Sequence, residues 1–440
     1  MAKLALISLG CAKNQVNLEE MRHLLEQAGH EIAQEIPGAD VALVNTCGFI
    51  DSAKAEAIGH ILELAQYKQA GEIERIIVTG CLSQRYEEEL FAELPEVDGV
   101  LGTGSYDNIV EAVVRVLAGE RVAYFGDIDA PLEKKARAIE NLSGWAYLKI
   151  AEGCDNSCAY CVIPSLRGKF RSRPLEGLLE EARELVAQGV GELILVAQDI
   201  TQYGKDLHGG PTLAELIKEL AQIEDLHWIR LHYLYPDGID ETLIETIANT
   251  EKVVPYLDIP IQHISDSILS AMNRRGTGAE IRALFRKLRD RLPGLTLRTS
   301  LITGLPGEEE AQLEELANFL RAYKIERVGI FPYSPQEGTP AEQMPKRVSE
   351  EEAKHRAELL LDLQAEILDA QLEASLGRKD RVLCVGYGEE QGGYYGRNGA
   401  QSPDIDGVVW LTSQEPLTIG EFYTVVYTAV EDGELLGEVQ

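Results

Sequence analysis

Residues 146–161 read Ala-Tyr-Leu-Lys-Ile-Ala-Glu-Gly-Cys-Asp-Asn-Ser-Cys-Ala-Tyr-Cys, an apolar strand candidate that runs into a loop with three thiols. These are the thiols of Cys154, Cys158 and Cys161, with three and then two residues between them. Thiols so close in sequence are poorly placed to join separate elements by disulfides, but they can turn inward on one loop around a metal centre. The spacing therefore predicts a metal centre directly after a strand.

The same stretch opens a series of alternating strand and helix patterns. Short apolar runs predict strands at 146–150, 192–197, 228–233, 256–261, 296–302 and 327–331. Helical patterns lie at about 175–188, 212–223, 240–249, 279–291 and 308–323, and a longer one begins at a Ser349–Glu352 capping box and runs to about Leu376. Six such units with right-handed crossovers predict an open, partial (β/α)6 barrel with its chemistry at the carboxyl ends of the strands.

The N-terminal part predicts a second parallel sheet with a thiol at each of three strand ends. Apolar runs at 4–9, 41–44 and 76–79 alternate with helical patterns, which indicates an α/β fold covered on both faces. Cys11, Cys47 and Cys81 each follow one of these runs. Because ligands gather at the carboxyl ends of parallel strands, we expect the three thiols to meet in a second cluster site. The alternative is three unrelated buried cysteines.

The remaining pattern predicts a third domain. From Asp380, short alternating segments separated by Gly and Asp turns predict a small five-stranded antiparallel β-barrel, with Cys384 buried in its first strand. A charged, weakly patterned segment at 129–143 marks the first boundary. We therefore expect domains at 1–125, 140–372 and 374–440.

Charge and cysteine usage limit the classes of partner. The chain has 41 Lys and Arg against 73 Asp and Glu, a formal charge of −32, which repels polyanions and makes nucleic acid a poor primary partner. No run approaches the roughly 20 apolar residues that a membrane span needs. The seven cysteines and the absence of a signal-like start at Met1 predict reduced thiols in a cytoplasmic protein.

Spacing alone leaves two kinds of metal centre open. Structural zinc sites usually have four protein ligands, and this loop offers three cysteines with no neighbouring histidine. Thiolates also hold iron–sulfur clusters, and a four-iron cluster held by three thiolates keeps one iron open for a substrate. An iron–sulfur centre and a zinc centre fit the spacing about equally well.

The pattern Cys154-x-x-x-Cys158-x-Tyr160-Cys161, in front of a partial barrel, resembles the radical S-adenosylmethionine superfamily. With the N-terminal cysteines and a terminal TRAM-like barrel, the whole chain resembles a methylthiotransferase. The resemblance implies two 4Fe-4S clusters, held by Cys154, Cys158 and Cys161 and by Cys11, Cys47 and Cys81. It implies that S-adenosylmethionine bound to the cluster at Cys154, Cys158 and Cys161 yields a 5′-deoxyadenosyl radical, that the other cluster supplies sulfur, and that an unidentified reductant supplies electrons.

Two branches of this family differ in substrate. One modifies an adenosine in tRNA, and the other modifies an aspartate of a small-subunit ribosomal protein, protein twelve, at the decoding centre. Ala12 stands where that second branch is expected to carry proline. The acidic terminal barrel, with four Lys and Arg against eleven Asp and Glu from residue 378 onward, favours a basic protein substrate over tRNA. Segments that resemble the ribosomal-protein branch are 8–14, 150–154, 167–173, 258–263 and 331–334.

Further residues are candidates for cofactor or substrate contacts. Tyr160, Glu192, Gln198, Gln262 and Gly304 are expected to contact the cofactor from the loop or from strand ends. Polar residues at such ends also cap helices, which is the alternative for each of them and for Asp199 and His263. An arginine among Arg167, Arg171 and Arg173, or Lys169, is a candidate for the target carboxylate, against the alternative of a solvated, ion-paired loop. From a different class, a non-catalytic iron–sulfur or zinc protein stays open.

Overall fold

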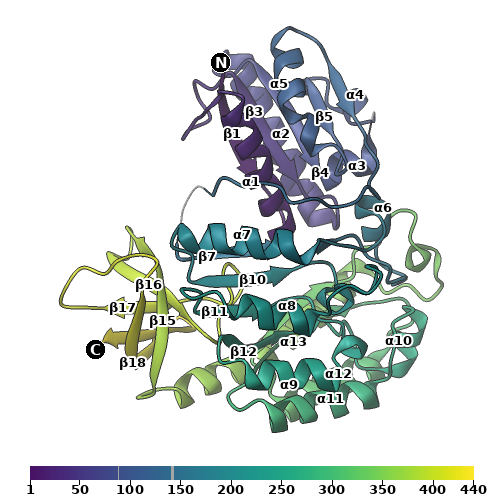
Figure 1. Cartoon of the computed structure of the whole chain (residues 1–440). Helices are drawn as coiled ribbons and strands as arrows, with labels where there is room; N and C mark the ends of the chain where they lie inside the picture. The colour runs from purple at the N-terminus through teal and green to yellow at the C-terminus, as the bar shows by residue number, and fades with distance from the viewer. Residues whose placement is uncertain (88, 140–142) are drawn as a thin grey trace. The chain divides into compact units, whose positions relative to one another are not determined.

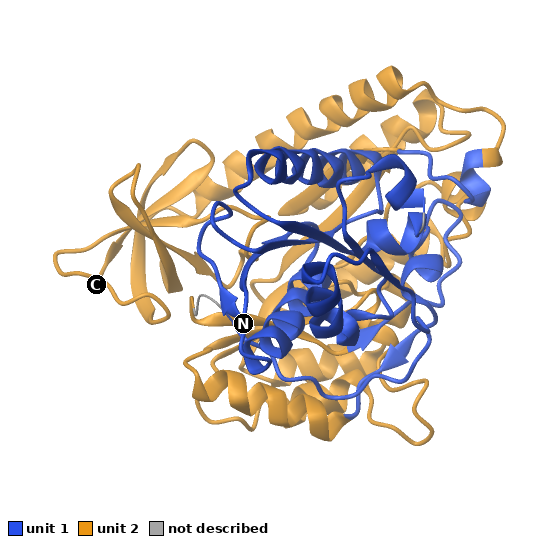
Figure 2. Cartoon of the chain, turned by 90° about the horizontal axis from the view of Figure 1, so that it is seen from above, with its two compact units in different colours: residues 1–140, 151–174, 334–342 blue, residues 141–150, 175–333, 343–440 orange. Residues whose placement is uncertain are grey.

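The chain forms two compact units that interleave along the sequence. A computed structural model describes residues 1–87, 89–139 and 143–440. The first unit comprises Met1–Glu140, Ala151–Pro174 and Ser334–Glu342, and the second comprises Asn141–Ile150, Leu175–Tyr333 and Gln343–Gln440 (Figure 2). The three-thiol loop therefore belongs to the same unit as the N-terminal cysteines.

A parallel six-stranded sheet forms the centre of the first unit (Figure 1). Its order is β2 (Glu31–Ile32), β1 (Lys3–Ser8), β3 (Val41–Thr46), β4 (Arg75–Gly80), β5 (Gly99–Leu101) and β6 (Val122–Tyr124). Helix α2 (Asp51–Ala70) packs on one face through a core that includes Ala42 and Val44, and α1 (Ala12–Gln27) and α5 (Ile109–Leu117) pack on the other through Val41 and Leu43. This alternation of β3 side chains is why its run is apolar throughout.

The second unit contains the predicted partial barrel. Six parallel strands pair in the order β14 (Arg327–Pro332), β13 (Thr296–Thr303), β12 (Val253–Asp258), β11 (Trp228–Leu231), β10 (Glu192–Val196) and β7 (Trp145–Lys149). The helices that connect or follow them are α7 (Leu175–Ala187), α8 (Leu213–Leu220), α9 (Glu241–Asn249), α10 (Asp266–Ala271), α11 (Gly278–Arg291), α12 (Glu310–Tyr323) and α13 (Glu350–Ala374). All six predicted strands are confirmed, and the Ser349 hydroxyl caps α13 by accepting a hydrogen bond from the Glu352 N–H.

The terminal segment closes into a five-stranded barrel, with strands in the order β15 (Lys379–Gly388), β16 (Gly393–Asn398), β17 (Val409–Thr412), β19 (Glu434–Val439) and β18 (Phe422–Glu431). The prediction of a wholly antiparallel barrel needs one correction, because β17 and β19 pair in parallel. Cys384 is fully buried in the barrel core, as predicted.

At residues 129–139, the segment predicted as a domain boundary belongs to the first unit, and it packs against α1. Arg137 pairs with Glu19 of α1 at 3.2 Å, and only 2% of the Arg137 side chain is exposed. The Ala138 N–H also donates to the Glu19 carbonyl. The charge of this segment therefore reflects ion pairing with α1, and the part of the predicted boundary at 140–142 lies outside the described residues.

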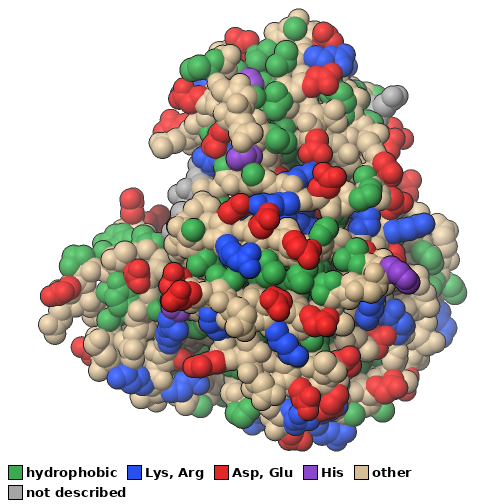
Figure 3. Space-filling model, viewed as in Figure 1, with side chains coloured by type: hydrophobic (Ala, Val, Ile, Leu, Met, Phe, Trp, Pro, Cys, Tyr) green, Lys and Arg blue, Asp and Glu red, His purple; other side chains and the backbone are tan. Residues whose placement is uncertain are grey.

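Charged side chains of both signs are interspersed over the face drawn in Figure 3. Among the described residues, no helix combines the length and the apolar character that crossing a membrane requires.

Glu192 joins the open sheet to the terminal barrel within the second unit. Its two carboxylate oxygens accept from Arg230 of β11 at 2.7 Å and from Arg397 of β16 at 2.8 Å. None of the three side chains is more than 2% exposed. Burial raises the pKa of Glu192, but the two guanidinium groups outweigh it and hold the pKa below its ordinary value.

We expect Glu192→Gln to destabilise the second unit by about 3–5 kcal/mol, because it leaves two buried guanidinium groups without their counter-charge. Urea unfolding followed by tryptophan fluorescence measures this, since Trp145, Trp228 and Trp410 all belong to that unit. Glu241→Gln is the matched control, because Glu241 also has two cationic partners, Lys287 and Arg291, but is half exposed. Its unfolding midpoint should stay nearly unchanged. Equal midpoints for the two variants would contradict this role of Glu192.

Candidate functional site

Three thiols lie at the carboxyl edge of the N-terminal sheet. Cys11 is the N-cap of α1, Cys47 follows β3, and Cys81 opens the short helix α3 (Cys81–Tyr86) directly after β4. Strands β1, β3 and β4 are neighbours in the sheet, so their carboxyl ends meet at one edge. The predicted convergence of the three cysteines on one sheet edge is present.

A buried polar network fixes the strand ends that carry these thiols. The Asn14 amide donates to the Leu9 and Thr46 carbonyls at 3.0 and 2.9 Å, and the Asn45 amide donates back to the Asn14 carbonyl at 2.7 Å. The Thr79 hydroxyl donates to the Asn45 side chain at 3.2 Å. These bonds satisfy polar groups that burial would otherwise penalise, and they lock α1 to β3 and β4.

Gly80 lets β3 and β4 approach each other at this edge. Its φ is +98°, and a Cβ there would lie 2.5 Å from the Thr46 carbonyl oxygen. A side chain at Gly80 would therefore push apart the strand ends that carry Cys47 and Cys81.

The three thiols experience different electrostatic surroundings. Burial raises the pKa of Cys11, but Lys13 and Arg167 outweigh it and bring the pKa below its ordinary value. Burial, followed by the neighbouring Cys81, raises the pKa of Cys47 to about 11. Burial raises the pKa of Cys81 although Arg167 acts to lower it. A negative charge on one thiol disfavours ionisation of the others. A cationic partner is therefore needed to keep more than one of them as a thiolate.

The second set of thiols sits on a loop that is closed by its own short ladder. Strands β8 (Ala151–Glu152) and β9 (Arg171–Ser172) pair antiparallel on either side of the loop. Gly153 turns the chain with φ +82°, and a Cβ there would lie 1.9 Å from the Lys169 carbonyl oxygen. The Cys154 N–H donates to the Gly168 carbonyl at 3.1 Å, and the Cys161 Sγ accepts from the Ile163 N–H at 3.4 Å.

The segments that carry the two sets pack against each other within the first unit. Helix α6 (Ile163–Arg167) follows the second set. Its N-cap Val162 and its Leu166 share an apolar cluster with Cys81 and Phe49. The Thr103 hydroxyl also donates to the Leu166 carbonyl at 2.6 Å. The first set is therefore held against the chain that follows the second.

Arg167 is the polar centre of this contact. Its Nε–H donates to the Cys81 Sγ at 3.2 Å, and its Nη1 donates to Asn17 Oδ1 at 2.9 Å and to Glu152 Oε2 at 3.1 Å. Its Nη2 donates to Asn14 Oδ1. With 3% of its side chain exposed and these partners in place, Arg167 does not fit the predicted role of binding a substrate carboxylate.

The other cations of this loop have different surroundings. Arg171 lies 3.4 Å from Asp129, whose carboxylate also accepts from the Lys169 N–H at 2.7 Å. Arg173 is buried. Asp129 falls in the segment predicted as a domain boundary, and its carboxylate holds this loop through Lys169 and Arg171.

The donor set fits iron–sulfur clusters. Within the part of the chain that the structure describes, no three His, Cys, Asp or Glu side chains lie close enough together to hold a single metal ion. In a four-iron cluster each of the three thiolates binds a separate iron. Three thiols on one sheet edge, with the guanidinium of Arg167 donating to one of them, suit such an anionic group.

The predicted cofactor contacts fall into different places. Tyr160 is buried in the three-thiol loop. Gln198 follows the carboxyl end of β10, and Gln262, with φ +68°, bridges to Leu301 of β13. Glu192 is instead the first residue of β10, at the opposite end of the strand, and its carboxylate is occupied by Arg230 and Arg397, so it does not fit a cofactor contact.

Gly304, His263 and Asp199 have structural surroundings. The Gly304 N–H donates to Glu308 Oε1 at 2.9 Å, and Glu308 Oε2 lies 3.3 Å from His263 Nε2. The His263 Nδ1 accepts from two backbone N–H groups. Asp199 accepts from the Thr201 N–H and so caps a short helix, which is the alternative that the sequence left open for it.

Several residues of the site were not singled out from sequence. Asn14, Asn17 and Glu152 hold Arg167, and Tyr106 is buried beside it. Asn14 and Asn17 are polar residues on the buried face of α1, and this is the feature of the sequence that could have identified them.

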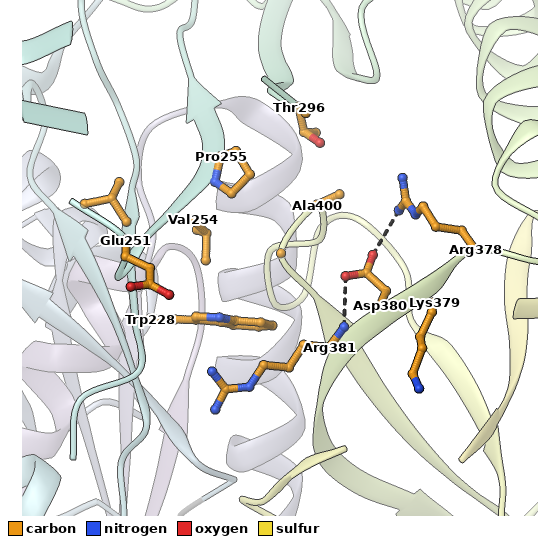
Figure 4. A pocket seen from close by; sticks show the side chains of 13 residues that line it. Trp228, Glu251, Val254, Pro255, Thr296, Arg378, Lys379, Asp380, Arg381 and Ala400 are labelled. Atoms are coloured by element: carbon orange, nitrogen blue, oxygen red, sulfur yellow. Dashed lines mark hydrogen bonds and ion pairs between the residues drawn. The ribbon is translucent and has the colours of Figure 1, made fainter. Parts of the chain in front are cut away.

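A separate groove in the second unit gathers most of the cations of the terminal barrel. It encloses about 400 Å³ and is lined by Trp228, Glu251, Arg378, Lys379 and Arg381, among others (Figure 4). Arg378 pairs with Asp380 at 2.9 Å, and the Arg381 guanidinium lies over the Phe422 ring. The fourth cation of the barrel, Arg397, is the buried partner of Glu192.

Comparison with protein-family models divides the chain into three regions. Residues 3–102 match the Uncharacterized protein family UPF0004, residues 148–320 match the Radical SAM superfamily, and residues 376–439 match the TRAM domain.

Solved structures with a similar fold include two radical enzymes. The radical S-adenosylmethionine methyltransferase TsrM from Kitasatospora setae, solved with cobalamin and a 4Fe-4S cluster, has a TM-score of 0.57 at 16% identity and covers 78% of this chain and 77% of its own. The cobalamin-dependent S-adenosylmethionine radical enzyme OxsB has a TM-score of 0.53 at 13% identity, over 84% of this chain and 56% of its own. These likenesses concern the fold.

Relatives of similar sequence cover the full length. The ribosomal protein uS12 methylthiotransferase RimO of Acetivibrio thermocellus is 46% identical over 99% of this chain and 98% of its own. The proteins of the same name from Geotalea uraniireducens and Geobacter sulfurreducens are each 48% identical over 99% of this chain and 98% of their own. The chain therefore belongs to the family of ribosomal protein uS12 methylthiotransferases, RimO.

Proposed function

We propose that this chain is a methylthiotransferase that adds a β-methylthio group to an aspartate of ribosomal protein uS12 by radical C–H activation. The observation that carries this proposal is the full-length similarity of 44–48% to relatives named for that activity. The presence of both three-cysteine sets in one compact unit supports it, because sulfur insertion needs a radical centre and a sulfur source near each other.

Each cysteine set would hold one 4Fe-4S cluster. Cys154, Cys158 and Cys161 leave one iron open for S-adenosylmethionine, and Cys11, Cys47 and Cys81 hold the other cluster. When bound, these groups supply the radical that removes hydrogen from the target carbon and the sulfur that replaces it. Tyr160 from the loop, and Gln198, Gln262 and Gly304, which follow the carboxyl ends of barrel strands, are our candidates for cofactor contacts. Gly304 has the weakest claim because its backbone N–H is already bonded to Glu308.

The protein's own residues prepare both sites. The β8–β9 ladder and the turn at Gly153 hold the three-thiol loop in a fixed shape. The Asn14, Asn45 and Thr79 network holds the other three strand ends. Packing of Val162 and Leu166 around Cys81 keeps apolar side chains, rather than water, against that thiol.

Charge supports a basic protein as substrate. The terminal barrel region has four cations against eleven acidic residues from residue 378 onward, and one of those cations, Arg397, is buried. Ribosomal proteins are basic because they neutralise RNA, so an acidic barrel favours their approach. We also propose a reductant as electron donor, a cytoplasmic location, and functional domains at 1–125, 140–372 and 374–440.

We expect anaerobically reconstituted protein to bind about eight irons per chain and to cleave S-adenosylmethionine when reduced. Replacing Cys154, Cys158 and Cys161 by Ala should halve the iron and abolish cleavage. Replacing Cys11, Cys47 and Cys81 by Ala should halve the iron and leave cleavage in place. Cys384→Ala is the control, because that thiol is buried in the barrel core and should not affect iron content. One zinc per chain without cleavage would instead indicate a non-catalytic zinc protein.

The substrate is tested by mass spectrometry of uS12 and of tRNA from cells that lack the gene. We expect uS12 to lose its methylthio group and tRNA to keep its methylthio-adenosine. The reverse result would assign the chain to the tRNA branch, and intact modification of both would refute the proposal.

A further inference from the structure

Arg167 contacts the segments that carry both cysteine sets. It follows the second set at the end of α6, yet its Nε–H donates to the thiol of Cys81 in the first set at 3.2 Å. Its Nη1 is 3.1 Å from the carboxylate of Glu152, two residues before Cys154. One guanidinium therefore connects a thiol of one set to the strand that leads into the other.

The surroundings make this contact strong. The side chains of Arg167 and Glu152 are 3% and 8% exposed, so solvent does not screen their charges. Asn17 and Asn14 of α1 accept hydrogen bonds from Nη1 and Nη2 and help to fix the guanidinium plane. Because several hydrogen bonds hold the planar guanidinium of Arg167, its Nε–H stays directed at the Cys81 sulfur.

Two buried hydroxyls belong to the same part of the first unit, one on Ser83 of α3 and the other on Tyr106. The Oγ of Ser83 and the hydroxyl of Tyr106 have no hydrogen-bond partner among the described residues. Both side chains are almost completely buried. The Tyr106 phenol is close enough to Arg167 and Cys81 to feel their charges. An unpartnered donor in a buried site is costly, so the surroundings of the Tyr106 phenol suit an acceptor-rich anionic group such as a cluster with its sulfides.

We propose that Arg167 is a positioning residue that fixes the Cys81 thiolate and raises the reduction potential of the cluster at Cys11, Cys47 and Cys81, with Glu152 moderating its effect. This rests on the proposed function, since it requires a cluster at that set. Reduction adds negative charge to the cluster. A nearby cation and its N–H donor favour the reduced form, and a nearby carboxylate opposes it.

The prediction has opposite signs for the two partners. Arg167→Gln removes the cation and should lower the midpoint potential of this cluster. Glu152→Gln keeps the shape and an acceptor for Arg167 but removes the anion, so it should raise the potential. Arg171→Gln is the matched control on the same loop, because the hydrogen bonds of the Arg171 guanidinium among the described residues go to Asp129 and to backbone carbonyls, not to a cysteine. It should leave the potential unchanged.

The measurement is a redox titration monitored by electron paramagnetic resonance on the full chain. Cys154, Cys158 and Cys161 are replaced by Ala in every sample, so that only the N-terminal cluster contributes to the signal. A fall for Arg167→Gln and a rise for Glu152→Gln support the inference. If Arg167→Gln fails to fold, the inference is still tested by whether the midpoint potential of Glu152→Gln lies above that of the Arg171→Gln control.

Two results would overturn it, and they have different meanings. A cluster that binds normally but has the same potential in all variants, or potentials that move in the same direction for both partners, would show that Arg167 only fills space. If the full chain with Cys154, Cys158 and Cys161 replaced by Ala takes up no iron, the two-cluster function itself is refuted.

Discussion

Neighbouring parallel strands must end at the same edge of their sheet, and the N-terminal site depends on this constraint. Strands β1, β3 and β4 are adjacent, and each is followed within a few residues by Cys11, Cys47 or Cys81. Three thiols far apart in sequence are brought together by the backbone ladder alone. Side chains then refine this placement, through Asn14 and Asn45 across the strand ends and through Gly80 where the strands approach most closely.

The second constraint is that the three-thiol loop packs against this sheet. The loop leaves β7 of the second unit, but its ladder, its helix α6 and its arginine belong to the first. Val162 and Leu166 contact Cys81 through apolar atoms, and Arg167 contacts it through a hydrogen bond. A reaction that moves sulfur from one site toward a radical made at another is consistent with this arrangement within one unit.

Much of the fold could be predicted from sequence because its strands are continuous apolar runs. All six barrel strands and the three cysteine-bearing strands were anticipated on that basis. Strands β5 and β6 were missed because each has only three residues, too few for a pattern. The polar contacts of α1 were missed because its first turns bury Lys13, Asn14 and Asn17, and an apolar periodicity cannot reveal a face whose partners are polar.

The roles of single charged residues were harder to predict than the cysteines. Glu192 looked like a cofactor contact, and it is a buried counter-ion for Arg230 and Arg397. Arg167 looked like a substrate anchor, and it is enclosed between Cys81 and Glu152. In both residues the deciding partner is distant in sequence, so composition and spacing do not reveal it. The spacing of a three-cysteine motif already brings its thiols close together, whereas the partners of an ion pair are brought together only by the fold.

The central claim is that one compact unit carries two iron–sulfur clusters, one at each cysteine set. Anomalous diffraction at the iron edge from crystals of the anaerobically reconstituted full chain tests it most directly. We predict two iron sites, one beside Cys11, Cys47 and Cys81 and the other beside Cys154, Cys158 and Cys161. A single iron site, or iron away from either set of thiols, would contradict the claim.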